Sequence, residues 1–304
     1  MPRYRWCPFP NRRGFRRLTT SPATLSWLLA LTLLAGACAQ PPALLRTMEA
    51  RQRVAELSAH FHKASEATNR AVMADTDDAS MALAGEARAA SADAQAALDA
   101  VAGLVQGLAY QPEVGQVEAL SASFSRYREL EERILSLAVE NTNLKAQRLS
   151  FGTASAQADA LVASLTAAAS PQAGWQWRAR AFEVTSALRE LQVLQAPHIA
   201  AVDDRVMDRI EERMTAAEAR VREGLSAMRA SAPSAPTGGS GSAIEAFDAF
   251  MATHREILAL SRKNTNVRSL ALVMNEKGAL TREGDQILQQ LQQALESHTS
   301  YGSR

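Results

Sequence analysis

The residues best able to do chemistry in this chain are its histidines, and their spacing disfavours a site. No two are four residues apart, as a helical metal pair requires, and the two nearest ones point to different helix faces. No Glu-x-x-His, Cys-x-x-Cys-His or glycine-rich phosphate segment is present. We therefore expect no enzyme, no catalytic residue, no metal and no cofactor, with each histidine structural or solvated (His60, His62, His198, His254 and His298).

Asparagine is the polar residue in an unusual place. Asn141 and Asn264 lie where the helical pattern requires an apolar residue. A buried amide without partners costs roughly 1–3 kcal/mol, so each should be hydrogen-bonded or near water. One interpretation is an asparagine that sets helix register, as in coiled coils. The other is a polar ligand-binding pocket between helices, with Asn143 and Asn266, or Lys145 and Arg268, at its rim. The basic pair would favour anionic ligands such as carboxylates.

The two asparagines belong to an internal repeat. Residues 124–165 align without a gap with residues 247–288, and Asn141-Thr142-Asn143 matches Asn264-Thr265-Asn266. A second block, Asp77-Asp78-Ala79-Ser80-Met81, matches Asp203-Asp204-Arg205-Val206-Met207 at an offset of 126 residues. Two blocks in the same order at nearly the same offset indicate a duplication.

Each repeat is predicted to contain four helices. Apolar residues spaced three and four apart indicate the first helix, the aspartate pairs cap the second, and the stripe through the asparagine marks the third. Turns near residues 150–153 and 275–278 should precede the fourth helices, and Pro197 should kink or break its helix. Short connections imply up-down bundles. The predicted fold class is all-α, with a signal peptide (1–37), a tether (38–43) and two tandem four-helix bundles (44–172 and 173–304).

The N-terminal segment has the features of an export signal. A basic stretch ends at Arg17, and an apolar run of about ten residues, too short to span a bilayer, leads through small residues to Cys38. The segment resembles a bacterial lipoprotein signal, in which this cysteine is acylated, although Ala35 stands where leucine is favoured. The alternative is ordinary cleavage after Ala37 or Ala39. Arg12-Arg13-Gly14-Phe15 also resembles a twin-arginine signal.

Composition and charge limit the possible partners. Aromatic residues make up only 5% of the chain, which favours alanine-rich helices over sheets. The first 17 residues carry six arginines, and without them the 32 acidic residues outnumber the bases by about five. A mildly acidic body of this kind gives no electrostatic basis for binding nucleic acid.

The helix plan, the repeat length of about 125 residues and the Ile-Leu-x-Leu…Asn-Thr-Asn segment resemble the four-helix-bundle sensory module of methyl-accepting chemotaxis receptors. The resemblance implies a periplasm-facing bundle that binds a small ligand or a partner helical protein and can form a homodimer. No apolar run near 18 residues follows Cys38, so we expect a detached module without transmembrane signalling output.

The expected location is the cell envelope, with the chain held on the outer or inner membrane by a lipid anchor at Cys38. The alternative location is secreted or soluble periplasmic. The alternative function is a structural or scaffolding envelope lipoprotein that binds no ligand.

Overall fold

The computed structural model describes residues 43–169, 174–231 and 239–301, and the predicted signal peptide and Cys38 lie outside them. The described residues are helical and contain no strand, which confirms the all-α fold class. Residues from Leu44 onward form one compact unit. Its elements are α2 (Ala43–Val72), α3 (Asp77–Leu108), α4 (Gln111–Glu140), α5 (Thr142–Leu149), η1 (Ser150–Ala154), α6 (Ser155–Ala168), α7 (Trp175–Ala200), α8 (Asp204–Ser231), α9 (Gly239–Lys263), α10 (Thr265–Leu272), η2 (Val273–Lys277) and α11 (Gly278–Tyr301).

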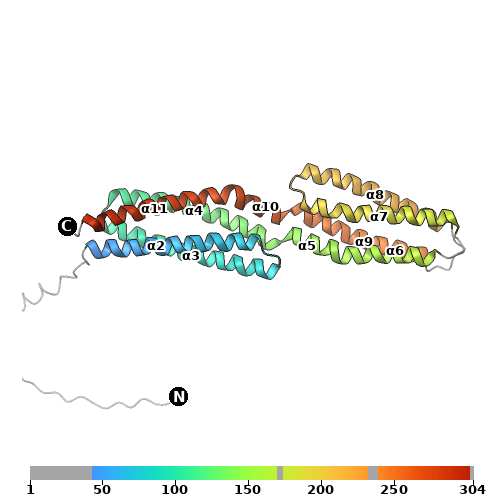
Figure 1. Ribbon diagram of the computed structural model, residues 1–304, viewed down its shortest axis with the longest axis horizontal. Coiled ribbons are helices and arrows are strands. Elements are labelled where there is room, and N and C mark those ends of the chain that lie inside the picture. Colours follow the sequence, from blue (N-terminus) through green and yellow to red (C-terminus); the bar gives the residue numbers. More distant parts are fainter. Residues whose placement is uncertain (1–42, 170–173, 232–238, 302–304) are drawn as a thin grey trace, which may run out of the picture. The chain divides into compact units, whose positions relative to one another are not determined.

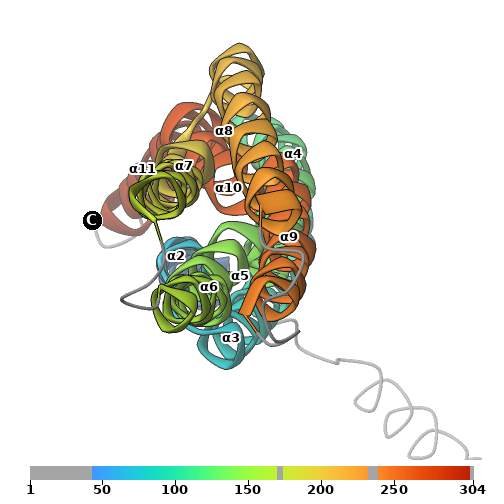
Figure 2. The ribbon, with the colours of Figure 1, turned by 90° about the vertical axis from the view of Figure 1, so that its right-hand side faces the viewer.

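The helices form two four-helix bundles that exchange their fourth helices. The first bundle contains α2, α3 and α4 from the first repeat and α11 from the second, and their apolar residues share one core. The second bundle contains α7, α8 and α9 from the second repeat and α6 from the first. Figure 1 shows α11 beside α4 and α6 beside α9, and Figure 2 shows α6, α7, α8 and α9 from their own end.

The predicted boundary at 172/173 therefore does not separate the bundles. Leu161 and Leu165 of α6 lie in the core with Leu188 and Leu191 of α7. Leu291 of α11 lies in the other core. Periodicity correctly indicated four helices in each repeat, but a buried stripe does not specify which helix fills it.

The helix breaks differ from those predicted. The segments expected to be turns, near 150–153 and 275–278, lie in or next to η1 and η2, which are π-helical and continue the helices on either side. The real breaks are Asn141 and Asn264, with φ of 50° and 54° in the left-handed region. Asparagine tolerates this conformation better than most residues because its short side chain bonds locally.

Two smaller expectations also need correction. Thr76, not the aspartate pair, caps α3, since its hydroxyl accepts a hydrogen bond from the Ala79 amide. Pro197 does not break its helix, because it lies inside α7, which continues to Ala200.

The offset of 126 residues, which comes from the Asp-Asp blocks, does not hold for the first two helices of each repeat. Buried residues of the two repeats coincide at 127 in these helices, as in Leu57 with Val184 and Phe61 with Leu188. In the next pair of helices, Ala94 matches Val221 and Leu98 matches Leu225. Aligning the two Asp-Asp motifs therefore shifts these helices by one residue relative to the match of their buried positions.

Candidate functional site

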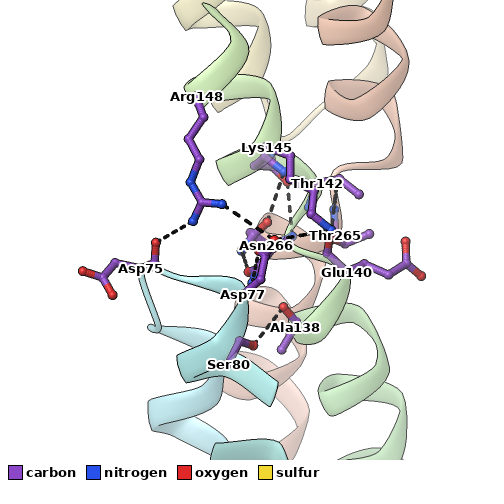
Figure 3. A network of polar contacts seen from close by, with 12 residues as sticks. Asp75, Asp77, Ser80, Ala138, Glu140, Thr142, Lys145, Arg148, Thr265 and Asn266 are labelled. Atoms are coloured by element: carbon purple, nitrogen blue, oxygen red, sulfur yellow. Dashed lines mark hydrogen bonds and ion pairs between the residues drawn. The ribbon is translucent and has the colours of Figure 1, made fainter. Parts of the chain in front are cut away.

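The junction, meaning Asn141–Asn143 and Asn264–Asn266, is where the two chain segments cross between the bundles. Each segment begins with a left-handed asparagine that ends one helix and starts the next. The Thr142 amide donates to the Thr265 hydroxyl and the Thr265 amide donates to the Thr142 hydroxyl, both at 3.1 Å. Residues at one repeat position therefore pair with each other, with nearly two-fold symmetry (Figure 3).

The four asparagines extend this symmetric pairing. The Asn143 amide donates to Oδ1 of Asn266 at 3.1 Å, and the Asn266 amide donates to Oδ1 of Asn143 at 3.2 Å. Nδ2 of Asn266 donates to Asn141, and Nδ2 of Asn143 donates to Asn264. The sequence singled out these four residues, and the structure brings them together.

The same side chains also bind neighbouring elements. Nδ2 of Asn141 donates to Asp77 at the start of α3, and Nδ2 of Asn264 donates to the Ala201 carbonyl after α7. Every amide side chain at the junction thus uses both its nitrogen and its oxygen. This geometry agrees with the register-setting interpretation, and a ligand-binding role for these asparagines stays a prediction.

The two basic residues predicted at the rim, Lys145 and Arg268, differ in their contacts. Nζ of Lys145 donates to the Glu140 carbonyl and lies 3.8 Å from Asp77. Arg148, which sequence reasoning did not select, reaches Asp77 at 3.7 Å and the Asp75 carbonyl (Figure 3). Arg268 is exposed. The Asp77 carboxylate therefore interacts with two basic side chains, Lys145 and Arg148, at one side of the junction.

A second polar feature, missed by the sequence analysis, is a buried glutamate in the first bundle. Glu131 of α4 is 3% exposed and accepts from the hydroxyls of Thr68 at 2.8 Å and Tyr127 at 3.0 Å. The Ser91 hydroxyl also donates to it. Burial raises the pKa of Glu131, although these three donors oppose the increase.

A buried cation that interacts electrostatically with Glu131 comes from the other repeat. Lys277 of η2 is 3% exposed, and its ammonium donates to the Ser65 carbonyl, the Ser65 hydroxyl and Asn69 at 2.7–2.8 Å. Burial lowers the pKa of Lys277 to about 8, although the Glu131 charge opposes the decrease. The exchanged helix thus places a positive charge near a buried carboxylate.

The second bundle has a buried histidine at the matching position. His254 aligns with Glu131 at the offset of 123, and Gln195 aligns with Thr68 at 127. Nε2 of Gln195 donates to Nδ1 of His254 at 3.0 Å, and the Ser150 hydroxyl of η1 donates to Gln195 at 2.7 Å. Burial lowers the pKa of His254 to about 4, so this imidazole is neutral near pH 7. In both bundles, one titratable residue on the third helix bonds to the first helix.

A serine, a histidine and a glutamate also lie in a row between α7, α8 and α9. The Ser261 hydroxyl is 2.8 Å from Nδ1 of His198, whose Nε2 is 2.8 Å from Glu211. Burial lowers the pKa of His198, and the hydrogen bond from Arg262 lowers the pKa of Glu211. Ser261 and His198 are both fully buried, so no substrate reaches the hydroxyl. We interpret this row as a link between three helices.

The duplicated titratable position was detectable in the sequence. Glu131 and His254 occur in the gapless block, and each adjoins the apolar stripe of its third helix. The apolar stripe through Tyr127, Leu130 and Ile134 does not itself indicate that the charged residue beside Leu130 is buried. The accompanying π-helical segments could not be detected, because their sequences, SFGTA and VMNEK, share no pattern.

Comparisons with known proteins supply no relative: no family model, no curated protein and no solved structure matches the chain. The resemblance to receptor sensory modules therefore stays a prediction. None of the helices in the described ranges is long and apolar enough to cross a membrane. In the same ranges, no three histidine, cysteine or acidic side chains gather as a metal site would need.

Proposed function

We propose that this protein is a non-catalytic, sensory-type binding module of the cell envelope, in which binding at one bundle changes the other. The observation that carries the proposal is the exchange of the fourth helices through the junction. Because α6 continues the chain of α4 and α11 continues that of α9, each repeat contributes to both bundles. A shift of one helix is therefore passed along covalent structure.

The π-helical segments support such a relay. η1 and η2 lie at matching positions of the two repeats, directly after α5 and α10. π-helical turns within α-helices often mark functional sites, because their hydrogen bonding is less regular. Each segment also contributes a polar side chain, Ser150 or Lys277, to the buried polar group of the bundle it enters.

Packing in the first bundle favours one alternative, a structural envelope protein that binds no ligand. Its apolar cavity beside Phe61, Tyr127 and Gly284 has a volume of only about 10 Å³, room for roughly one water. A larger ligand would have to displace side chains such as Phe61. The junction also favours the structural alternative, because each of its asparagine side chains already uses both its nitrogen and its oxygen in hydrogen bonds.

One experiment separates the two functions. Residues 43–304 would be screened by thermal shift against amino acids, organic acids and aromatic compounds, since a ligand of the native state raises its melting temperature. Hydrogen exchange would then be measured in both bundles with each compound that binds. Protection in both bundles supports the sensory proposal. Absence of any binding compound contradicts small-molecule sensing and supports the structural alternative, and protection limited to one bundle contradicts the relay.

The envelope location is tested separately. If Cys38 carries a lipid, the full chain should fractionate with membranes and the Cys38→Ser variant should be released from them. Replacing Ser300, which lies near the other end of the chain, with alanine serves as a control. Membrane association that survives the loss of Cys38 would contradict the anchor.

A further inference from the structure

Helix α7 carries an exposed apolar stripe opposite the face it buries. Its inward face holds Val184, Leu188 and Leu191. On the outward face, Trp175, Phe182 and Val193 are 77%, 75% and 71% exposed. A surface helix normally has one apolar face, and the second apolar face needs a partner to cover it.

The stripe has a regular spacing. Trp175, Phe182, Ser186 and Val193 are separated by seven, four and seven residues, so they fall within roughly 40° of one another around the helix axis. The sequence of spacings, seven, four and seven, is identical when it is counted from either end of the stripe. A two-fold axis perpendicular to α7 at the level of Val184 would place Trp175 of one copy opposite Val193 of another.

The same axis would set Phe182 of one copy opposite Ser186 of the other, where the surface is hollow. Ser186 and Ala187 of α7 and Gly224 of α8 line a groove of about 310 Å³. An apolar cavity of roughly 150 Å³ holds a benzene ring, so the groove has room for a phenyl side chain. Gly224 lets α7 and α8 pack closely beneath the groove, since a Cβ there would lie 2.4 Å from the buried Val184 side chain.

The charges around the groove suit a second copy of the chain. Its rim holds Arg180 and Arg220 together with Glu183 and Glu223, so positive and negative groups are equal in number. A strongly charged partner would find no complementary field there. A copy of the same surface meets both signs and avoids net repulsion.

The first repeat lacks this surface. At the offset of 127, Phe182 corresponds to Ala55 and Val193 to Glu66, and both of these positions are exposed on α2. Phe182 and Val193 are therefore particular to α7, whereas Trp175 corresponds to Met48, which is 54% exposed on α2.

We propose that the outward face of α7 is a self-association surface, on which two copies pair antiparallel with each Phe182 inserted in the groove beside Ser186 of the other copy. This inference does not depend on ligand binding or on the relay between the bundles. The expected assembly is a closed, two-fold dimer, because the surface complements itself.

Disulfide trapping tests the arrangement. Residues 44–304 form one compact unit with both cores. Residues 43–304 contain no cysteine, so introduced thiols are the only ones present. The double variant Trp175→Cys, Val193→Cys should form a covalent dimer on mild oxidation, because these positions face each other between copies. Within one chain they are about 27 Å apart, too far for a bond. Neither single variant should be trapped. Trapping of a single variant, or no trapping of the double variant, would overturn the proposal.

Light scattering after size exclusion gives the second readout. The unchanged unit should elute as a dimer, and Phe182→Glu should raise the dissociation constant by at least about 100-fold, since each dimer loses two buried rings. Phe151→Glu is the matched control, because Phe151 is 67% exposed and belongs to η1, not to α7. A monomer for the unchanged unit, or equal dissociation by both variants, would contradict the proposal.

Discussion

At the scale of single residues, one repeat position carries a buried acid in the first bundle and a buried imidazole in the second. Glu131 and His254 are 3% and 2% exposed, and each bonds to the same position of the first helix, Thr68 or Gln195. Buried titratable groups make stability depend on pH whenever their pKa differs between folded and unfolded chains. The two bundles should therefore respond to pH in different ranges.

His254 should destabilise the fold in mild acid. Its pKa falls from 6.5 to about 4 on folding, so the unfolded chain binds the extra proton between these values and stability decreases as the pH falls. We expect the unchanged protein to lose about 2 kcal/mol more than His254→Gln between pH 7 and pH 5. Urea unfolding at both pH values measures the difference. His62→Gln, which removes a largely exposed imidazole, is the control variant. Parallel curves for the unchanged protein and His254→Gln would contradict this prediction.

Lys277 should make the stability of the fold depend on pH in the alkaline range. Its pKa falls from 10.5 to about 8, so above pH 8 the unfolded chain holds the proton that the folded chain has released. Stability should therefore rise with pH, and between pH 7 and pH 10 the unchanged protein should gain about 2 kcal/mol relative to Lys277→Met. Denaturant midpoints of the two proteins give the result. The control variant is Lys263→Met, which removes an exposed lysine. A constant difference between the unchanged protein and Lys277→Met would show that Lys277 keeps its ordinary pKa.

At the scale of elements, periodicity predicted the helices and the repeat but misplaced the breaks. The stripe through Tyr127, Ile134 and Asn141 continues to Leu144 with little change, so the left-handed turn at Asn141 leaves almost no trace in the spacing. Gly152 and Gly278 suggested turns, yet glycine is also accommodated in or beside a π-helical segment. The pairing of Asn143 with Asn266 depends on tertiary contacts, which local patterns do not encode.

The π-helical segments should tolerate a deletion that regular helix does not. A π turn holds one residue more than the α-helix around it, so removing Gly152 from η1 should leave regular α-helix with both flanks in their original register. Removing exposed Ala160 from α6 should instead rotate the rest of that helix by about 100° and expose Leu161 and Leu165. Circular dichroism melts should show a cooperative transition near the original temperature for the first deletion. The second deletion should lower it strongly. Equal damage by both would contradict the view of η1 as an inserted residue.

At the scale of the whole molecule, the chain has the organisation of two copies of one repeat that have exchanged their last helices. Each copy supplies three helices to one bundle and the fourth to the other, and the crossing segments pair Thr142 with Thr265. The same contacts could form between two separate copies of one repeat. Exchange of identical elements is a low-cost route to dimers.

The first repeat alone, residues 43–172, should therefore fold only as an exchanged dimer. One copy lacks the helix that covers Leu57, Phe61 and Leu120, and a second copy can supply its own α6 through pairing at Thr142. We expect helicity and melting temperature to rise with concentration, because folding and association are coupled. In that dimer Ala154 takes the place of Lys277, so Glu131 loses its nearby cation, and Glu131→Gln should strengthen association at pH 7. Sedimentation across a hundredfold concentration range measures the association. A folded monomer whose melting temperature does not depend on concentration would contradict this prediction, because it would show that a single repeat can fill its own core.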